Sequence, residues 1–187
     1  QGGAESLDDL AWFQGAGISH VVSACNVRCA HPHLEVLHVG VKDDDLANIQ
    51  QHLPRVLRFI HAARAAGGVV YVHCSQGDSR SSALVVAYVM AAAKRPADEA
   101  LRFLTCRRDV AFPNLGFFHQ LFTFWAGGQC AELHDQLQRE AAGLFARDAE
   151  EVAGVLADTA HADVDVSAFM DCLRSAHAAD GRPPNGP

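Results

Sequence analysis

The sequence lacks the features that mark membrane, secreted and nucleic-acid-binding proteins. Among 187 residues, no apolar run reaches the roughly 18 needed to span a bilayer, and the first residues do not have the pattern of a signal peptide, so we expect none. Basic residues are in the minority, with 15 Lys and Arg against 22 Asp and Glu, which argues against nucleic acid or an anionic membrane as a partner. The six cysteines lack disulfide-framework spacing and so favour a reducing compartment. We expect a cytoplasmic protein, with the nucleus as the alternative.

One junction between two apolar segments carries the chemistry of the chain. The run Val69 to Val72 is typical of a buried parallel strand, and residues 81–91 repeat apolar side chains at helical spacing. Between these segments, the seven residues 74–80 are small or polar. In such a loop the backbone N–H groups and the positive end of the helix converge on one point. The sequence therefore predicts an anion site at this junction.

Three residues of this loop suit phosphate chemistry. A thiol with an ordinary pKa of about 8.5 becomes a nucleophilic thiolate near a helix N-terminus, which is where Cys74 is expected. Gly77 lets the backbone turn sharply and approach an anion closely. Arg80 presents a planar pair of donors that matches two phosphate oxygens. A buried free cysteine is often only a small core residue, but the combination with His, Gly, Arg and Ser favours a catalytic loop.

The segment 73–81, HCSQGDSRS, resembles the signature loop of the cysteine-dependent protein tyrosine phosphatases, in the form of the dual-specificity phosphatases. Residues 17–26 resemble the early strand of that family, residues 37–45 its acid-loop strand and residues 112–121 its closing helix. The resemblance covers residues 1–126 and implies an α/β catalytic domain, with a central, mostly parallel β-sheet flanked by helices. Residues 127–187 then form a C-terminal helical appendage with a flexible end.

The resemblance also implies a role for each loop residue. Cys74 attacks phosphorus and forms a cysteinyl-phosphate, and Ser81 stabilises the thiolate as it leaves in the second step. His73 fixes the loop by hydrogen bonding and helps to keep Cys74 ionised. The phosphate oxygens are held by the loop Ser75, Gln76, Gly77, Asp78, Ser79 and Arg80. No metal or cofactor is required.

A general acid is needed to protonate the leaving oxygen, and three consecutive aspartates follow the acid-loop strand. The register of Val41, Lys42 and Asp43 fits the family pattern best, so we assign Asp43 as the acid. Asp44 and Asp45 are expected to lie in a solvated loop, where they help to cap the following turn.

Two departures from the family pattern affect the interpretation. Asp78 puts a carboxylate at a loop position that is usually apolar or aromatic. Facing the pocket, it would repel phosphate and oppose ionisation of the thiol; at the rim, it would select basic substrates. The chain also begins at Gln1 without the leucine-rich strand that usually precedes the first helix, so either the sheet lacks an edge or the chain is a fragment.

The favoured function is a protein phosphatase that acts on phosphotyrosine and on phosphoserine or phosphothreonine. The alternative is a phosphate-binding module without turnover, which Asp78 supports. Sulfur transfer is disfavoured by Arg80 and the separate acid loop, and inositol phospholipids by the absence of lysine from the phosphate loop. The expected partner is a phosphorylated protein, and residues 129–176 are a candidate surface for a regulator or for self-association.

Other cysteines and the remaining helices leave further expectations. The set Cys25, Cys29, His31 and His33 has spacing compatible with zinc, but a strand end and a surface turn explain it more simply. Oxidised Cys74 could form a disulfide with a neighbouring cysteine. Apolar spacing predicts a helix that begins near Pro54 and ends at Gly67, and another that follows Pro96. Composition predicts one helix over residues 129–157 and a shorter one over 166–176.

Overall fold

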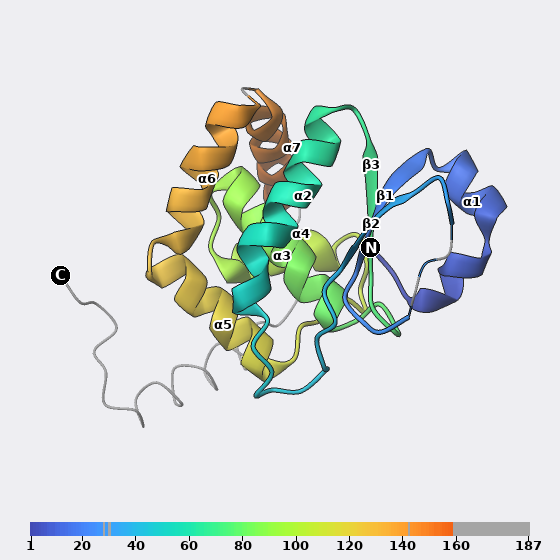
Figure 1. The fold of residues 1–187 in the computed structure, drawn as a ribbon. Coiled ribbons are helices and arrows are strands. Elements are labelled where there is room, and N and C mark those ends of the chain that lie inside the picture. Colours follow the sequence, from blue (N-terminus) through green and yellow to red (C-terminus); the bar gives the residue numbers. More distant parts are fainter. Residues whose placement is uncertain (28, 30, 142, 159–187) are drawn as a thin grey trace.

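The computed structural model describes residues 1–27, 29, 31–141 and 143–158 (Figure 1). The elements follow in the order η1 (Ala4–Asp8), α1 (Leu10–Gly15), β1 (Ile18–Ser23), β2 (Glu35–His38), η2 (Gln50–His52), α2 (Leu53–Ala65), β3 (Val69–His73), α3 (Arg80–Ala93), α4 (Ala97–Thr105), α5 (Leu115–Ala126), α6 (Gln129–Glu140) and α7 (Leu144–Asp158). The helices predicted near Pro54 and after Pro96 are α2 and α4.

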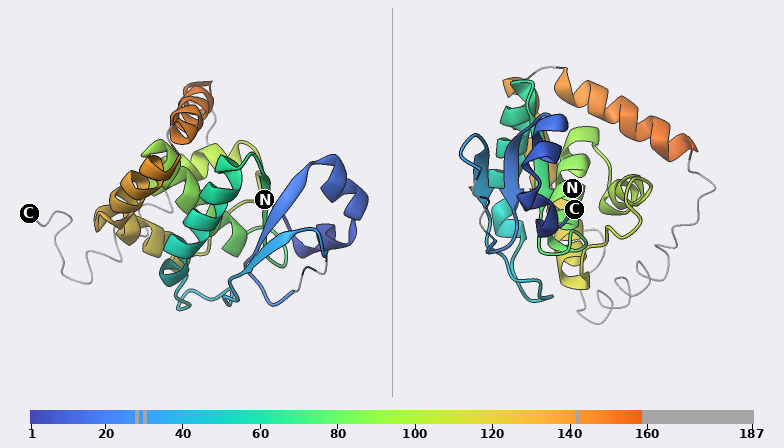
Figure 2. Two further views of the ribbon diagram at one scale, coloured as in Figure 1. Left: turned by 45° about the horizontal axis from the view of Figure 1, so that its top comes forward. Right: turned by 90° about the vertical axis from the view of Figure 1, so that its right-hand side faces the viewer.

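The three strands form a parallel sheet in the order β2-β1-β3, in agreement with the predicted α/β fold. Alternate side chains of a strand point to opposite faces, so Val21 and Tyr71 pack with Phe13 of α1 on one face. Val22 and Val72 belong to the main core on the other face, where the later helices gather (Figures 1 and 2).

The first residues of the chain lie at one edge of β3, and the beginning of this strand differs from the sequence prediction. A single parallel bridge joins Gly2 to His73, so the first residues of the chain lie along this strand. Val69 is 46% exposed. The prediction that both faces of the strand are buried is therefore wrong at its start, because Val69 and Val70 border an open cavity of about 550 Å³.

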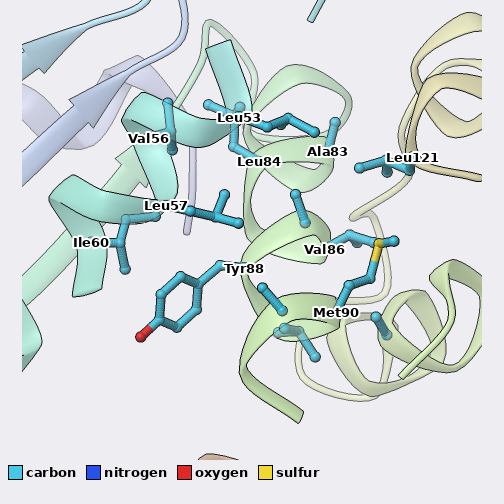
Figure 3. Close-up of a cluster of buried hydrophobic side chains, with 14 of the residues drawn as sticks. Leu53, Val56, Leu57, Ile60, Ala83, Leu84, Val86, Tyr88, Met90 and Leu121 are labelled. Carbon is cyan, nitrogen blue, oxygen red and sulfur yellow. The ribbon is translucent and has the colours of Figure 1, made fainter. Parts of the chain in front are cut away.

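Helix α3 is the centre of the molecule. It contacts α2, α4, α5, α6 and α7, and nearly all of its side chains are buried, as expected for a helix that is apolar on all sides. Figure 3 shows side chains of α2, among them Leu53 and Leu57, next to Leu84 of α3. Within the described ranges, no helix combines the length and the apolar character that crossing a bilayer would require.

The C-terminal part of the described chain consists of two helices. The prediction of one helix over residues 129–157 is wrong, because α6 ends at Glu140 and Gly143 takes a left-handed conformation with φ 90° before α7 begins. Leu137 and Phe145 join the same core as α3. The predicted helix over 166–176 and the predicted flexible end lie outside the described residues.

Candidate active site

The segment between β3 and α3 curls around the sulfur of Cys74. This side chain is fully buried, and its Sγ accepts a hydrogen bond from the backbone N–H of Gly77 at 3.2 Å. The Oγ of Ser81, in the first turn of α3, lies 3.3 Å from the same sulfur. The structure thus brings Cys74, Gly77 and Ser81 together around one atom.

Gly77 occupies a position that other residues would not fit. Its φ is +78°, and a Cβ built on it would lie 2.2 Å from the carbonyl carbon of Gly2. Its carbonyl oxygen accepts hydrogen bonds from Nε of Arg108 at 3.1 Å and from Nε2 of Gln1 at 2.6 Å. The loop is therefore held at Gly77 by hydrogen bonds from two residues, Gln1 and Arg108, that are distant from it in the sequence.

Arg80 connects the loop to residues 41–45, which follow β2 and are called the acid segment below. Its side chain is 13% exposed; Nη2 donates to Ser75 Oγ at 3.0 Å, and Nη1 donates to the carbonyl oxygen of Val41 at 3.3 Å. Its Nε lies 3.3 Å from Oδ2 of Asp43, an ion-pair distance without hydrogen-bond alignment. These contacts fix the guanidinium between the two segments, where its donors can meet an anion.

Asp43 is held against the loop by two neutral donors as well as by Arg80. Its Oδ1 accepts hydrogen bonds from Ser79 Oγ at 2.7 Å and from Asn114 Nδ2 at 2.9 Å. The side chain remains 32% exposed, so the carboxyl group is accessible from the solvent. Of the three consecutive aspartates, Asp43 is thus the one that contacts Arg80.

The other two aspartates make structural contacts. Asp44 Oδ1 accepts from the backbone N–H of Leu46 at 2.8 Å, the turn-capping contact that the sequence predicts. Asp45 Oδ1 lies instead against the first turn of α5, where it accepts from the N–H of Gly116 at 3.3 Å. Asp44 therefore caps a turn, whereas Asp45 joins the acid segment to α5.

Asn114 has a role that the sequence analysis did not identify. Its Oδ1 accepts from the backbone N–H of Phe117 at 2.8 Å and so caps the N-terminus of α5, while its Nδ2 reaches Asp43. An Asn followed by an apolar helix is a recognisable capping signal in the sequence. The second contact has no sequence signal, because it depends on where α5 packs.

The carboxylate of Asp78 folds back onto its own loop. Its Oδ1 accepts from the backbone N–H of Ser79 at 2.7 Å, so it takes up one of the N–H groups that the sequence pattern assigns to phosphate. The carbonyl oxygen of Asp78 accepts from the N–H of Phe112 at 3.0 Å and from Oγ of Ser82. Asp78 thus contributes to the shape of the loop as well as to its charge.

His73 supports the loop from the end of β3. Its Nδ1 lies 3.2 Å from the carbonyl oxygen of Cys74, and its ring stacks on Tyr71 with a centroid separation of 5.9 Å. Burial lowers the pKa of His73, mainly through desolvation. The ring is therefore neutral near pH 7 and acts on the loop by hydrogen bonding and packing rather than by a positive charge.

The cysteine and histidine set considered for zinc does not form a cluster. Nε2 of His31 makes a 2.5 Å hydrogen bond with the carbonyl oxygen of Leu7, and Cys25 and Cys29 are free thiols. In the described part of the chain, no three His, Cys, Asp or Glu side chains lie close enough together to hold a metal ion.

Comparison with known proteins gives a consistent match. Residues 2–126 match the family described as dual specificity phosphatase, catalytic domain. Dual specificity protein phosphatase 22-A of Danio rerio is 40% identical over 111 residues, which cover 58% of this chain and 52% of that protein. Dual specificity protein phosphatase 15 of Mus musculus is 36% identical over 121 residues, which cover 64% of this chain and 51% of that protein. The chain thus spans about half the length of these curated relatives.

Solved structures resemble the fold over most of their length. The crystal structure of DUSP15 superposes with a TM-score of 0.71 at 29% identity, covering 74% of this chain and 88% of that chain. The crystal structure of the human tyrosine phosphatase-like serine/threonine/tyrosine-interacting protein gives a TM-score of 0.65 at 29% identity, covering 68% of this chain and 90% of that chain.

Proposed function

The chain belongs to the dual specificity phosphatase family, and on this basis we propose that it hydrolyses phosphotyrosine and phosphoserine or phosphothreonine in proteins through a cysteinyl-phosphate intermediate. The observation that carries the proposal is the convergence on one loop of a buried thiol, a guanidinium and a carboxyl group. Ser81 Oγ lies 3.3 Å from the sulfur of Cys74, and Nε of Arg80 lies 3.3 Å from the carboxylate of Asp43.

In the first step, the Cys74 thiolate attacks phosphorus in line with the leaving oxygen. The S–P bond forms as the P–O bond breaks, and the bonding electrons leave with the alkoxide or phenoxide oxygen, which takes the proton of the Asp43 carboxyl group. Arg80 and the loop N–H groups bind the equatorial oxygens, where negative charge is spread in the transition state. The hydrogen bond from Arg80 to Ser75 Oγ holds the guanidinium for this task.

In the second step, water hydrolyses the cysteinyl-phosphate. Asp43, now a carboxylate, takes a proton from the attacking water; the S–P bond breaks, and the thiolate and inorganic phosphate are released. Ser81 donates its hydroxyl proton toward the leaving sulfur and so lowers the energy of the thiolate. His73 keeps the loop in place through the carbonyl group of Cys74.

The proposed substrate is a phosphorylated protein, and the proposed location is the cytoplasm or the nucleus, where a free catalytic thiol stays reduced. The phosphate loop has no lysine to bind the additional phosphates of an inositol phospholipid. Helices α6 and α7 belong to the segment that we consider for a regulator or for self-association.

A second candidate function is phosphate binding without turnover. It is favoured by Asp78, because this carboxylate adds negative charge to the loop and engages the N–H of Ser79. One protein of similar fold is itself named tyrosine phosphatase-like and interacting rather than phosphatase. Such a module would bind inorganic phosphate but leave aryl phosphates intact.

Hydrolysis of para-nitrophenyl phosphate in the presence of a metal chelator, from mildly acidic to mildly basic pH, tests the proposal. Cys74→Ser should abolish activity. Asp43→Asn should lower it about 10²- to 10⁴-fold and remove the decline at high pH, because asparagine has no proton to lose. Asp44→Asn is the matched control and should retain activity, since Asp44 only caps a turn.

Two outcomes would contradict the phosphatase assignment. An intact chain that binds inorganic phosphate but releases no nitrophenol would favour the phosphate-binding module, and Asp78 would then be the residue to replace. Activity that survives Cys74→Ser would exclude the cysteinyl-phosphate intermediate.

A further inference from the structure

The side chain of Gln1 contacts both the loop 74–80 and the first turn of α3. Its Nε2 lies 2.6 Å from the carbonyl oxygen of Gly77, 2.9 Å from Ser81 Oγ and 3.2 Å from Ser82 Oγ. The backbone next to it is paired with β3, since the N–H of Gly2 donates to the carbonyl oxygen of Val72 at 3.0 Å. The amide of Gln1 is therefore anchored where it meets Ser81.

The partners determine which way this amide is oriented. A backbone carbonyl can only accept a hydrogen bond, so the atom that faces the oxygen of Gly77 must be the NH₂ group. One N–H of Gln1 is directed to Gly77, and the other is shared by the hydroxyl groups of Ser81 and Ser82. Ser82 Oγ donates its own proton to the carbonyl oxygen of Asp78 and is thus free to accept.

The orientation of the amide in turn determines the direction of the Ser81 hydroxyl. Since Ser81 Oγ accepts from Gln1, its single proton remains for another acceptor, and the sulfur of Cys74 lies 3.3 Å away. A hydrogen bond donated to a charged group favours the charged form of that group. The contact between Ser81 and Cys74 would otherwise allow either atom to be the donor.

We propose that Gln1 is a positioning residue that turns the Ser81 hydroxyl toward Cys74 and thereby stabilises the thiolate. The part of this inference that concerns the release of thiolate in the second step rests on the proposed phosphatase function. The part that concerns the resting thiolate does not, because it depends only on the contacts among Gln1, Ser81 and Cys74.

The test measures the ionisation of Cys74 without turnover, by its rate of alkylation with iodoacetamide as a function of pH. Trypsin releases residues 65–80 as a peptide in which Cys74 is the only cysteine, so mass spectrometry follows this site alone. All variants are made in the full chain, with identical preceding residues. Every variant retains the other ionisable groups around the site, among them Glu5 in η1, His38 at the end of β2, Tyr71 and His73 on β3, Asp78 in the loop, Arg80 on α3, Asp43 after β2 and Arg108 after α4. The amino group of Gln1 also lies close to Arg108, and the identical preceding residues keep its state the same in all variants.

Ser81→Ala should move the midpoint of the alkylation profile upward by about 1 to 2 pH units, because a shift of this size corresponds to the loss of one hydrogen bond to a charged group. Gln1→Met, which keeps the length of the side chain but removes its N–H groups, should move it upward by about 0.5 to 1, because the Ser81 hydroxyl remains but is no longer oriented. In the Ser81→Ala background, Gln1→Met should cause no further change. Gln14→Met, at an exposed position on α1, is the matched control.

Three results would overturn the inference: an unchanged midpoint in Gln1→Met, an unchanged midpoint in Ser81→Ala, or an equal effect of Gln1→Met in both backgrounds. The last would mean that Gln1 acts on the loop as a whole. A chain that shows the expected pattern of midpoints but hydrolyses no aryl phosphate would refute the proposed function and leave the role of Gln1 intact.

Discussion

Replacing Asp148 by asparagine tests whether α7 is an integral part of the folded unit. The carboxylate of Asp148 receives two hydrogen bonds from Arg64 of α2, at 2.5 Å and 2.7 Å, and the same guanidinium donates to the hydroxyl of Tyr88 on α3 at 3.0 Å. The hydrogen bonds with Asp148 raise the pKa of Arg64, and burial raises the pKa of Tyr88 to about 12. One ion pair thus joins α7 to two earlier helices.

The size of the effect depends on the burial of the two partners. Removing one member of a fully buried ion pair costs about 3–5 kcal/mol, because the other charge is left without compensation. Asp148 is 10% exposed and Arg64 is 32% exposed at the side chain, so water can partly rehydrate the guanidinium. We therefore expect Asp148→Asn to lower the free energy of unfolding by about 2–3 kcal/mol, and Tm by about 4–12 °C.

Thermal and urea denaturation, followed by circular dichroism, measure this loss. The matched control is Glu151→Gln on the same helix, because Glu151 pairs with Arg107 at 2.5 Å but both side chains are exposed, at 57% and 42%. An exposed pair contributes only about 0–1 kcal/mol. Equal losses in the two variants would contradict the view that the buried pair contributes more to stability than the exposed one. No loss in Asp148→Asn would contradict the view that α7 unfolds together with the helices that precede it.

Two further predictions concern pH and the loop backbone. Burial lowers the pKa of His61 and of His73, so below pH 6.5 the unfolded state binds more protons than the folded state. The contribution of these two histidines to the free energy of unfolding should therefore be complete above pH 6.5 and decrease as the pH falls below it. Urea titrations from pH 7.5 to 5 should show this decrease. If His61→Leu leaves the change of unfolding free energy with pH the same, His61 is excluded as a source. Gly77→Ala should lower aryl phosphatase activity at least about 10-fold, because φ +78° costs an L-residue about 1–2 kcal/mol and the new Cβ would lie 2.2 Å from the backbone of Gly2. Nitrophenyl phosphate hydrolysis and circular dichroism together measure this, and full activity would show that the first residues of the chain can move aside.

The sequence alone was sufficient for the features that depend on neighbouring residues. The strand β3, the loop from Cys74 and the helix α3 follow one another without a break, so their pattern predicts the order of elements that the structure shows. The anion site at this junction stays a prediction. The contact of Asp44 with the following turn was predictable for the same reason. By contrast, the break between α6 and α7 was missed, because the helix-forming composition of residues 129–157 outweighed the signal of Gly143.

The partners of the site residues could not be predicted in this way. Asn114 reaches Asp43 across 71 positions and Gln1 reaches Ser81 across 80, and neither contact has a periodic or motif signal. The sequence leaves open whether Asp78 faces the pocket or the rim, and it gives no sign that the carboxylate accepts a hydrogen bond from the adjacent N–H of Ser79. Local hydrogen bonding of this kind competes with other orientations, and the packing of the loop determines which one prevails.

Strand and helix periodicity and the order of residues 73–81 are local properties, and for this reason the amino-acid sequence was enough to infer the fold class and the chemical groups of the site. How these groups are oriented depends on the tertiary structure instead. The direction of the Ser81 hydroxyl and the contacts of the Asp43 carboxyl group require segments that meet when helices pack on the sheet. Such long-range contacts follow from burial of the core as a whole rather than from any short stretch of the chain.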